Sequence, residues 1–265
     1  MNNFGGAPNV LELRNITQTY NDKNGKPYDL FNKFTFTVED IPDKGQFLAI
    51  MGESGCGKST LLRYLSGLQK PTAGEILIEG RHLTPKDTIP MVFQQPSSLE
   101  WFSVLDNVAL PLTLKGYSRK DSIEQAMAMI KIVGLDGHEK KYAKSPALSG
   151  GQLQRVAIAR SLVANPKTIL LDEPFSALDT TTRKKMQEFL MELFARSEIA
   201  NLNPTVILVT HDEREAAYVA NDIVVMKSNP SGIKAHVKVN IGQRTPEVRK
   251  SSQFNQIVDY LESII

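Results

Sequence analysis

The sequence has a single cysteine, no long hydrophobic run and no excess of either charge. The cysteine, Cys56, excludes a disulfide within the chain and is typical of a reducing compartment. The longest apolar runs, such as 206–209, are far below the roughly 18 residues of a membrane-spanning helix. Residues 1–10 have no apolar core and do not resemble a secretory signal. We therefore expect the chain to be soluble on its own.

The charge balance is close to neutral, with 31 basic and 29 acidic residues and a formal net charge of +2. Bulk electrostatic attraction to nucleic acid or to anionic lipid is therefore not expected, and no nucleic-acid partner is predicted. The 265 residues, of which 41% are hydrophobic and 23% charged, are sufficient for a full hydrophobic core. The length alone allows one large domain or two small ones.

Short apolar runs alternate with longer helix-like segments, which is typical of an α/β protein. Residues 47–51, 168–171 and 205–209 are continuous apolar runs, as expected of strands in a parallel sheet that is covered on both faces. The first run is followed by a glycine-rich turn and then by a helix predicted from Lys58 to about Ser66.

Between about 95 and 165 the pattern becomes helical, so a helical block is expected within the α/β core. A first helix is predicted from the candidate N-cap Ser118 to Gly134, which stops it. A second helix is predicted over 149–164 because no proline interrupts it. The apolar face of the first helix is expected to comprise Ile123, Ala126, Met127, Ile130 and Val133. After Ser228 the sequence predicts a turn at 229–232, an edge strand at 235–239 and a final helix at 254–265.

Residues 52–59 match the phosphate-binding pattern G-x-x-x-x-G-K-[ST] between a predicted strand and a predicted helix. Backbone N–H groups in the glycine-rich turn, with the positive end of the helix dipole, can surround a phosphate group. Lys58 is expected to reach the β- and γ-phosphates, and the Ser59 hydroxyl to bind magnesium. A small residue suffices at Cys56, so a redox role is not favoured. The predicted nucleotide contacts here are Gly52, Glu53, Ser54, Gly55, Cys56, Gly57, Lys58, Ser59 and Thr60.

Acidic residues and a histidine follow two of the predicted strands. Asp172 and Glu173 come directly after an apolar run, at the strand end where doubly wound sheets bind their ligands. Asp172 suits the magnesium shell, and Glu173 is the candidate general base that polarises an attacking water. His211 follows the run 205–209 and is expected at the same sheet edge, where it can contact the γ-phosphate or order the water.

A second anion-binding pattern lies in the helical block. Ser149 can cap a helix, while Gly150 and Gly151 expose backbone N–H groups at its start, and Gln152 completes the run Leu-Ser-Gly-Gly-Gln. One chain therefore contains two half-sites for phosphate.

Together these motifs resemble those of ABC (ATP-binding cassette) ATPases, in which they occur in the same order. The resemblance implies a P-loop NTPase core of the RecA type with a mostly parallel sheet, an antiparallel N-terminal β portion and an inserted helical subdomain. It also implies one ABC ATPase domain over 1–265, with ATP and Mg²⁺ as cofactors. The implied parts are a nucleotide-binding core at 9–94 and 166–228, a helical subdomain at 95–165 and a short tail at 229–265.

The resemblance further implies that two copies of the chain pack head to tail around ATP. The phosphate loop of one copy and Ser149 to Gln152 of the other would then enclose each nucleotide. Gln94 matches the glutamine that touches magnesium and senses the γ-phosphate, and Asp179 matches an aspartate along the dimer seam. Tyr20 falls where the family places the aromatic residue that stacks on adenine, with Tyr28 as the alternative.

The stretch 173–179 resembles the importer form of the family, and 99–108, 178–183 and 244–249 resemble the nitrate, sulfonate and taurine group. Glu100 and Glu53 depart from that group, which usually has proline at both positions. An importer implies transmembrane permease subunits and, indirectly, a solute-binding protein. It also implies a cytoplasmic position, peripheral on the inner face of the cell membrane.

Trp101 and Phe102 are candidates for a groove that receives a short helix of the permease, although a lone tryptophan is more often a packing residue. Two other functions remain open at this point. The chain resembles ATPases of lipid or lipoprotein export complexes less closely, and it shares its catalytic motifs with soluble ABC ATPases that act outside transport. The latter usually have two cassettes or a long coiled coil, and this sequence has neither.

Overall fold

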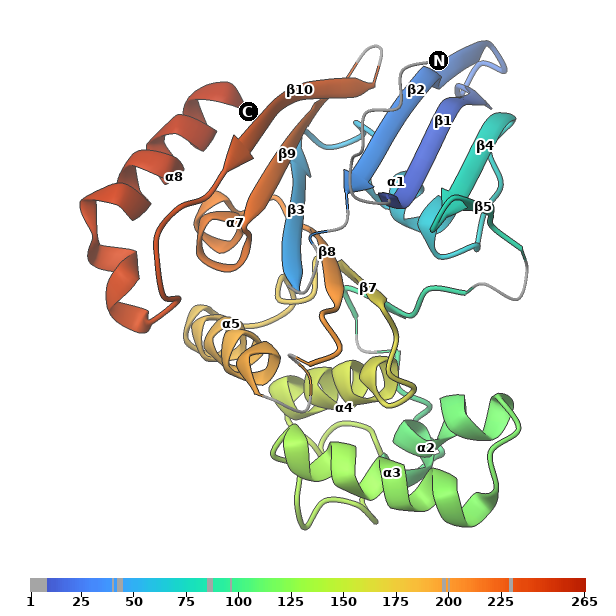
Figure 1. The fold of residues 1–265 in the computed structure, drawn as a ribbon, viewed down its shortest axis with the longest axis vertical. Coiled ribbons are helices and arrows are strands. Elements are labelled where there is room, and N and C mark those ends of the chain that lie inside the picture. The colour runs from blue at the N-terminus through green and yellow to red at the C-terminus, as the bar shows by residue number, and fades with distance from the viewer. Residues whose placement is uncertain are drawn as a thin grey trace.

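Two β-sheets and a group of helices make up the fold (Figure 1), in a computed structural model that describes residues 9–39, 41, 45–84, 88–95, 97–196, 199, 201–228 and 231–265. One sheet has the strand order β2-β1-β4-β5 and the other β10-β9-β3-β8-β7-β6. The strands are β1 Asn9–Asn21, β2 Pro27–Glu39, β3 Gln46–Gly52, β4 Ala73–Ile78, β5 Arg81–His82, β6 Met91–Val92, β7 Thr168–Asp172, β8 Thr205–Val209, β9 Asp222–Lys227 and β10 Gly232–Lys238. The helices are α1 Lys58–Leu65, α2 Val104–Leu114, α3 Arg119–Ile132, α4 Gly150–Leu162, α5 Thr180–Ala195, α7 Glu213–Val219, η1 Pro246–Lys250 and α8 Ser252–Ile264. Over the described residues, none of these helices is both long and apolar enough to cross a bilayer.

The six-stranded sheet is parallel from β9 to β6, with β10 antiparallel at its edge. Alternate residues of β3 enter two different apolar clusters, since Ala49 and Met51 pack on one face and Leu48 and Ile50 on the other. Both faces need apolar side chains, so residues 47–51 of the strand are all apolar. The three continuous apolar runs are therefore confirmed as central strands, and the α/β fold with them.

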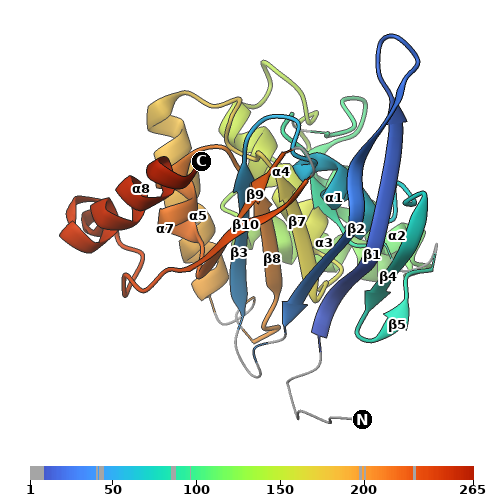
Figure 2. The same cartoon turned by 90° about the horizontal axis from the view of Figure 1, so that it is seen from above.

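Different layers cover the two faces of this sheet (Figure 2). Helices α4, α5, α7 and α8 contribute buried residues to the first cluster, together with α2 and α3. Helix α1 and the antiparallel sheet supply the second cluster, in which Leu11, Leu13 and Phe34 are buried. In β2 buried and exposed residues alternate over its second half, as expected of a sheet with one solvated face. This arrangement brings the start of α1 to the end of β3 between the two layers.

The helical block consists of α2, α3 and α4, which contact one another. Helix α4 begins within the Leu-Ser-Gly-Gly-Gln run, and we call it the signature helix. Ser118 caps α3 as predicted, since its Oγ accepts a hydrogen bond from the backbone N of Asp121 at 3.1 Å. The predicted apolar face of α3 is partly wrong, because Ile123 and Met127 are 36% and 41% exposed. The buried residues are instead Ser122, Ala126, Met129, Ile130 and Val133. Their spacing of three or four positions places them on one face of α3, the helix that contacts α2 and α4.

The C-terminal segment is built into these layers. β10 pairs with β9 and extends the core sheet, close to the edge strand predicted at 235–239. In α8, Phe254, Val258 and Leu261 are buried against the main core, and the helix contacts α7. Residues 229 and 230 of the predicted turn lie outside the described residues.

Candidate functional site

The phosphate loop joins β3 to α1 and has backbone angles that require glycine. Gly57 has a φ of 99°, and a Cβ there would lie 2.5 Å from the ring of Phe31. Gly52 has a φ of 141° and passes against the backbone carbonyl of Met226. No other residue type fits these two positions without strain. The loop is thus held in a curve by contacts with β2 and β9.

Lys58 is the first residue of α1 and bends back across this loop. Its Nζ donates hydrogen bonds to the carbonyl oxygens of Gly52 at 2.7 Å and Glu53 at 2.9 Å. The side chain is 9% exposed. A buried ammonium beside the N-terminus of a helix creates a positive site suited to phosphate.

A cavity of about 580 Å³ opens over the loop. This volume lies within the range of roughly 300–1,000 Å³ that is typical of small-molecule sites. Its walls come from the loop, the end of β7, the end of β8 and the β1–β2 hairpin. The lining residues are Tyr20, Tyr28, Leu30, Gly52, Ser54, Gly55, Gly57, Lys58, Ser59, Thr60, Glu173 and His211.

The acidic end of β7 lies beside the loop. Burial, together with the negative charge of Glu173, raises the pKa of the Asp172 carboxyl, while the neighbouring Ser59 side chain lowers it. The charges of the nearby Arg63 and Lys58 also lower this pKa. A carboxylate and a hydroxyl oxygen form the all-oxygen donor set that Mg²⁺ prefers. The residues present therefore fit a magnesium ion bound next to the phosphate loop.

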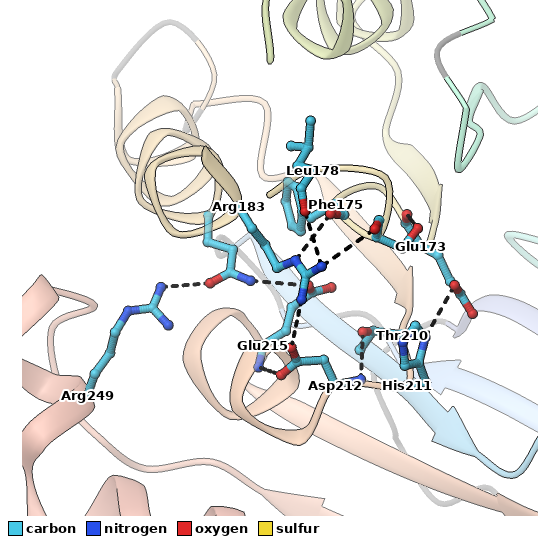
Figure 3. Close-up of polar contacts among 11 residues, drawn as sticks. Glu173, Phe175, Leu178, Arg183, Thr210, His211, Asp212, Glu215 and Arg249 are labelled. Atoms are coloured by element: carbon cyan, nitrogen blue, oxygen red, sulfur yellow. Dashed lines mark hydrogen bonds and ion pairs between the residues drawn. The ribbon is translucent and has the colours of Figure 1, made fainter. Parts of the chain in front are cut away.

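Glu173 and His211 face each other at the ends of adjacent strands (Figure 3). His211 Nδ1 lies 3.2 Å from Glu173 Oε2. Glu173 has a φ of 45°, a left-handed backbone that costs a non-glycine residue about 1–3 kcal/mol. Its backbone N donates to the carbonyl of Val209 at 2.9 Å, which fixes this turn against β8. The predicted base and histidine are thus brought together on one wall of the cavity.

Tyr20 and Tyr28 both line the cavity, so the structure does not separate the two adenine candidates. They are opposite each other in the β1–β2 register, with ring centroids 6.2 Å apart. The Tyr20 hydroxyl accepts a hydrogen bond from Gln69 at 2.8 Å, whereas Tyr28 is 49% exposed. Tyr20 is the more firmly held of the two rings.

Four predicted residues, Ser149 to Gln152, do not line this cavity. Ser149 caps α4, and Ser149 and Gln152 exchange the two hydrogen bonds of a capping box. Ser149 and Gly150 are exposed, and neither lines the cavity over the chain's own phosphate loop. The two predicted half-sites are therefore separate within one chain.

Five further predicted residues also lie outside the cavity lining: Glu53, Cys56, Asp172, Gln94 and Asp179. Cys56 is fully buried, and the Glu53 carboxylate accepts a hydrogen bond from Ser228 Oγ at 2.6 Å. Gln94 is exposed in the segment after β6. Asp179 caps α5, since its carboxylate accepts hydrogen bonds from the backbone N of Thr181 at 3.1 Å and Thr182 at 3.0 Å. A hydrogen bond from the Thr182 side chain, together with these backbone bonds, lowers the pKa of the Asp179 carboxyl.

A polar cluster behind the Glu173 and His211 pair was not predicted from the sequence (Figure 3). It includes Arg183 on α5 and Glu215 on α7, whose Oε2 accepts a hydrogen bond from Gln187 Nε2 at 3.1 Å. Gln187 Oε1 in turn accepts one from Arg249 at 2.8 Å. These residues come from three separate helices, and no sequence spacing signals that they meet. The one signal in the sequence is local: Arg183 lies near the predicted site residue Asp179, in the first turn of the helix that Asp179 caps.

Glu215 makes the stability of the fold depend on pH. Burial, with the nearby Asp212 charge, raises the pKa of Glu215 from 4.5 to about 7. Between those values the folded chain keeps the proton that the unfolded chain has lost, so stability falls as pH rises through this window. We expect Glu215→Gln to gain stability relative to the wild type by about 3 kcal/mol between about pH 4 and pH 8. Urea unfolding of both proteins at each pH measures this; a difference that is equal at the two pH values would contradict it.

Comparison with known proteins agrees with this geometry. Residues 32–176 match the family described as ABC transporter. The chain is 40% identical to the aliphatic sulfonates import ATP-binding protein SsuB of Bacillus thuringiensis, over 86% of this chain and 88% of that protein. It is 35% identical to the nitrate import ATP-binding protein NrtD of Synechocystis, over 96% and 94%. It is 44% identical to the spermidine/putrescine import ATP-binding protein PotA of Mycoplasma capricolum, over 82% of this chain and 59% of that protein.

A solved structure is similar over most of the chain. The ATP-binding cassette MJ0796, a dimer in a post-hydrolysis state bound to ADP and phosphate, has a TM-score of 0.69 and 33% identity. The match covers 87% of this chain and 99% of that one. With the phosphate loop, the acidic strand end and the separate signature helix in place, the chain belongs to the ABC transporter family as an ATP-binding subunit, an ATPase coupled to transport.

Proposed function

We propose that this chain is the ATP-hydrolysing subunit of a membrane importer for a small anionic solute of the sulfonate or nitrate kind. The observation that carries the ATPase part is the convergence of Lys58, Glu173 and His211 on one cavity. The importer part rests on the import ATP-binding proteins among its relatives, and the solute class on two of them. We further propose that the chain works at the cytoplasmic face of the membrane, attached to permease subunits that act with a solute-binding protein.

The proposed chemistry is hydrolysis of ATP to ADP and phosphate. The backbone N–H groups of the phosphate loop and the Lys58 ammonium bind the phosphates. Glu173 accepts the proton of the attacking water, and His211, which touches Glu173, orients this water and the γ-phosphate. Ser59, Asp172 and Gln94 would hold a magnesium ion, which neutralises phosphate charge when bound. All of these groups belong to one chain. The side of the nucleotide that faces away from the phosphate loop needs further hydrogen-bond donors.

Those donors come, in our proposal, from a second copy of the chain. Gly150 and Gly151 at the start of α4 lie outside the cavity of their own chain, so in this proposal their N–H groups face the nucleotide of a partner, while the capping box uses the N–H groups of Ser149 and Gln152. Asp179, exposed at the start of α5, would lie along the same seam. The MJ0796 cassette, a dimer bound to ADP and phosphate, supports the pairing of two copies.

We expect Tyr20→Ala to weaken ATP affinity about tenfold, and Tyr28→Ala to weaken it less. The reason is that stacking on adenine favours the ring that is already held in place, and Gln69 holds Tyr20. Competition of ATP against a fluorescent ATP analogue measures both affinities, with Tyr20→Phe as the control that keeps the ring. A larger loss for Tyr28→Ala would assign the stacking role to Tyr28 instead.

Trp101 is the proposed anchor for the permease. Its side chain is 70% exposed and lies edge-on to Phe102, with ring centroids 6.3 Å apart. An exposed indole beside a second aromatic ring can insert between the turns of a short partner helix.

Replacing Trp101 by Ala should therefore separate assembly from catalysis. We expect ATP hydrolysis by the purified chain to stay within about twofold of wild type, since Trp101 is outside the cavity, while co-purification with a co-expressed permease falls about tenfold or more. Leu114→Ala, which removes another exposed apolar side chain of the helical block, is the matched control. Equal recovery of permease with wild type and Trp101→Ala would contradict this docking site.

A further inference from the structure

The guanidinium of Arg183 lies between the two loops that carry the proposed catalytic pair (Figure 3). We propose that Arg183 is a positioning residue for ATP hydrolysis, which ties the 173–179 loop to the 210–212 loop and so sets the geometry of Glu173 against His211. This inference rests on the proposed roles of those two residues. It adds to them a residue that does not line the nucleotide cavity.

One side of the guanidinium holds the loop after β7. Arg183 Nε donates to the carbonyl of Phe175 at 3.3 Å, and Nη2 donates to the carbonyl of Leu178 at 3.2 Å. The carbonyl of Ser176 lies 3.5 Å from the same Nη2. These carbonyls belong to the turns that leave Glu173, whose own carbonyl accepts from Ser176 Oγ at 2.9 Å. One side chain thus contacts three carbonyl groups of the loop between Glu173 and Asp179.

The other side of the guanidinium faces the loop after β8. Arg183 Nη1 lies 3.6 Å from Asp212 Oδ2. The second oxygen of that carboxylate, Oδ1, accepts a hydrogen bond from the backbone N of Glu215 at 2.8 Å and caps α7. Asp212 N also donates to Thr210 Oγ1 at 3.1 Å. Asp212 is therefore held from both sides, and it directly follows His211 in the chain.

Arginine suits this connection better than lysine. A planar guanidinium has five N–H donors in a rigid fork, whereas a lysine ammonium is a point charge on a flexible stem. Arg183 is itself anchored, because its backbone N donates to the carbonyl of Asp179 at 2.8 Å in the first turn of α5. A shift of α5 would therefore move Asp179, Glu173 and His211 together.

Variants of Arg183 test this role in the purified full-length chain. We expect Arg183→Ala and Arg183→Lys to lower kcat for ATP hydrolysis roughly tenfold to a hundredfold, since small misplacements of catalytic groups have effects of that size. KM for ATP and the affinity for a fluorescent ATP analogue should stay within about twofold, because Arg183 is outside the cavity. Added guanidinium ion should restore part of kcat in Arg183→Ala and none in Glu173→Gln. Lys184→Ala, at the exposed next position of α5, is the matched control and should keep the wild-type kcat.

The outcomes separate this inference from the proposed function. If the wild type hydrolyses ATP and Glu173→Gln does not, an unchanged kcat in Arg183→Ala overturns the positioning role alone. If kcat falls but KM rises with it and guanidinium restores nothing, Arg183 supports folding only, and the inference is also overturned. A wild type without turnover would remove the proposed function and this inference together. Should Arg183→Ala fail to fold, Arg183→Gln, which keeps one amide donor, is measured in its place, with the same expected fall in kcat.

Discussion

Replacing Glu173 by Gln is expected to reduce ATP hydrolysis by roughly a hundredfold to ten-thousandfold, the usual contribution of a general base. The amide has nearly the shape of the carboxylate but cannot accept the proton of the attacking water. ATP binding should stay intact, because the phosphate loop and Lys58 are unaltered. Unhydrolysed ATP would then hold two chains together, so the variant is expected to elute as a dimer with ATP and as a monomer without it.

Steady-state release of phosphate and size-exclusion chromatography measure these two effects. Glu79→Gln is the matched control, since Glu79 is an exposed glutamate paired with Lys167 at 2.6 Å and does not line the nucleotide cavity. Turnover at the wild-type rate in Glu173→Gln would contradict the role of base. Loss of ATP binding in that variant would instead show that the Glu173 carboxylate contributes to binding ATP and not only to its hydrolysis.

Replacing Lys58 by Ala is expected to weaken nucleotide binding itself, by roughly tenfold to a hundredfold for the loss of charge-assisted hydrogen bonds. Lys58 is 9% exposed, and its ammonium lies within the phosphate loop. A cation of the solvent therefore does not take the place of the lost charge. Titration with a fluorescent ATP analogue measures the affinity. Lys70→Ala, at an exposed lysine beyond the end of α1, controls for the general loss of a positive charge. Unchanged affinity in Lys58→Ala would show that the phosphates bind elsewhere.

The central strands and the phosphate loop could be predicted because each is a local property of the sequence. The centres of β3, β7 and β8 are continuous apolar runs because both of their faces are covered, and the loop follows β3 directly. The prediction for the apolar face of α3 is partly wrong because Ile123 and Met127 are apolar but exposed to solvent. Only the packing of the neighbouring helices decides which stripe is buried.

The polar cluster behind the site could not be predicted, because it depends on contacts between distant segments. Arg183 meets Asp212, and Gln187 meets Arg249, across 29 and 62 residues of sequence. The sequence could not decide between Tyr20 and Tyr28 for a similar reason. The register of the β1–β2 hairpin places both rings at the same cavity. Motifs identify the residue types that chemistry needs, while long-range packing decides what holds them.

The most direct test of a site shared between two chains is to mix two inactive variants. Glu173→Gln removes the base, and Gly150→Glu adds a negative charge at the start of α4 toward the partner's phosphates, at an exposed position where helices accept acidic residues. In a mixed dimer one site has both defects and the other has none. The shared site predicts that an equal mixture regains roughly a quarter of wild-type hydrolysis, since about half of the dimers are mixed and each has one intact site. Activity no greater than that of the two variants measured separately would contradict it.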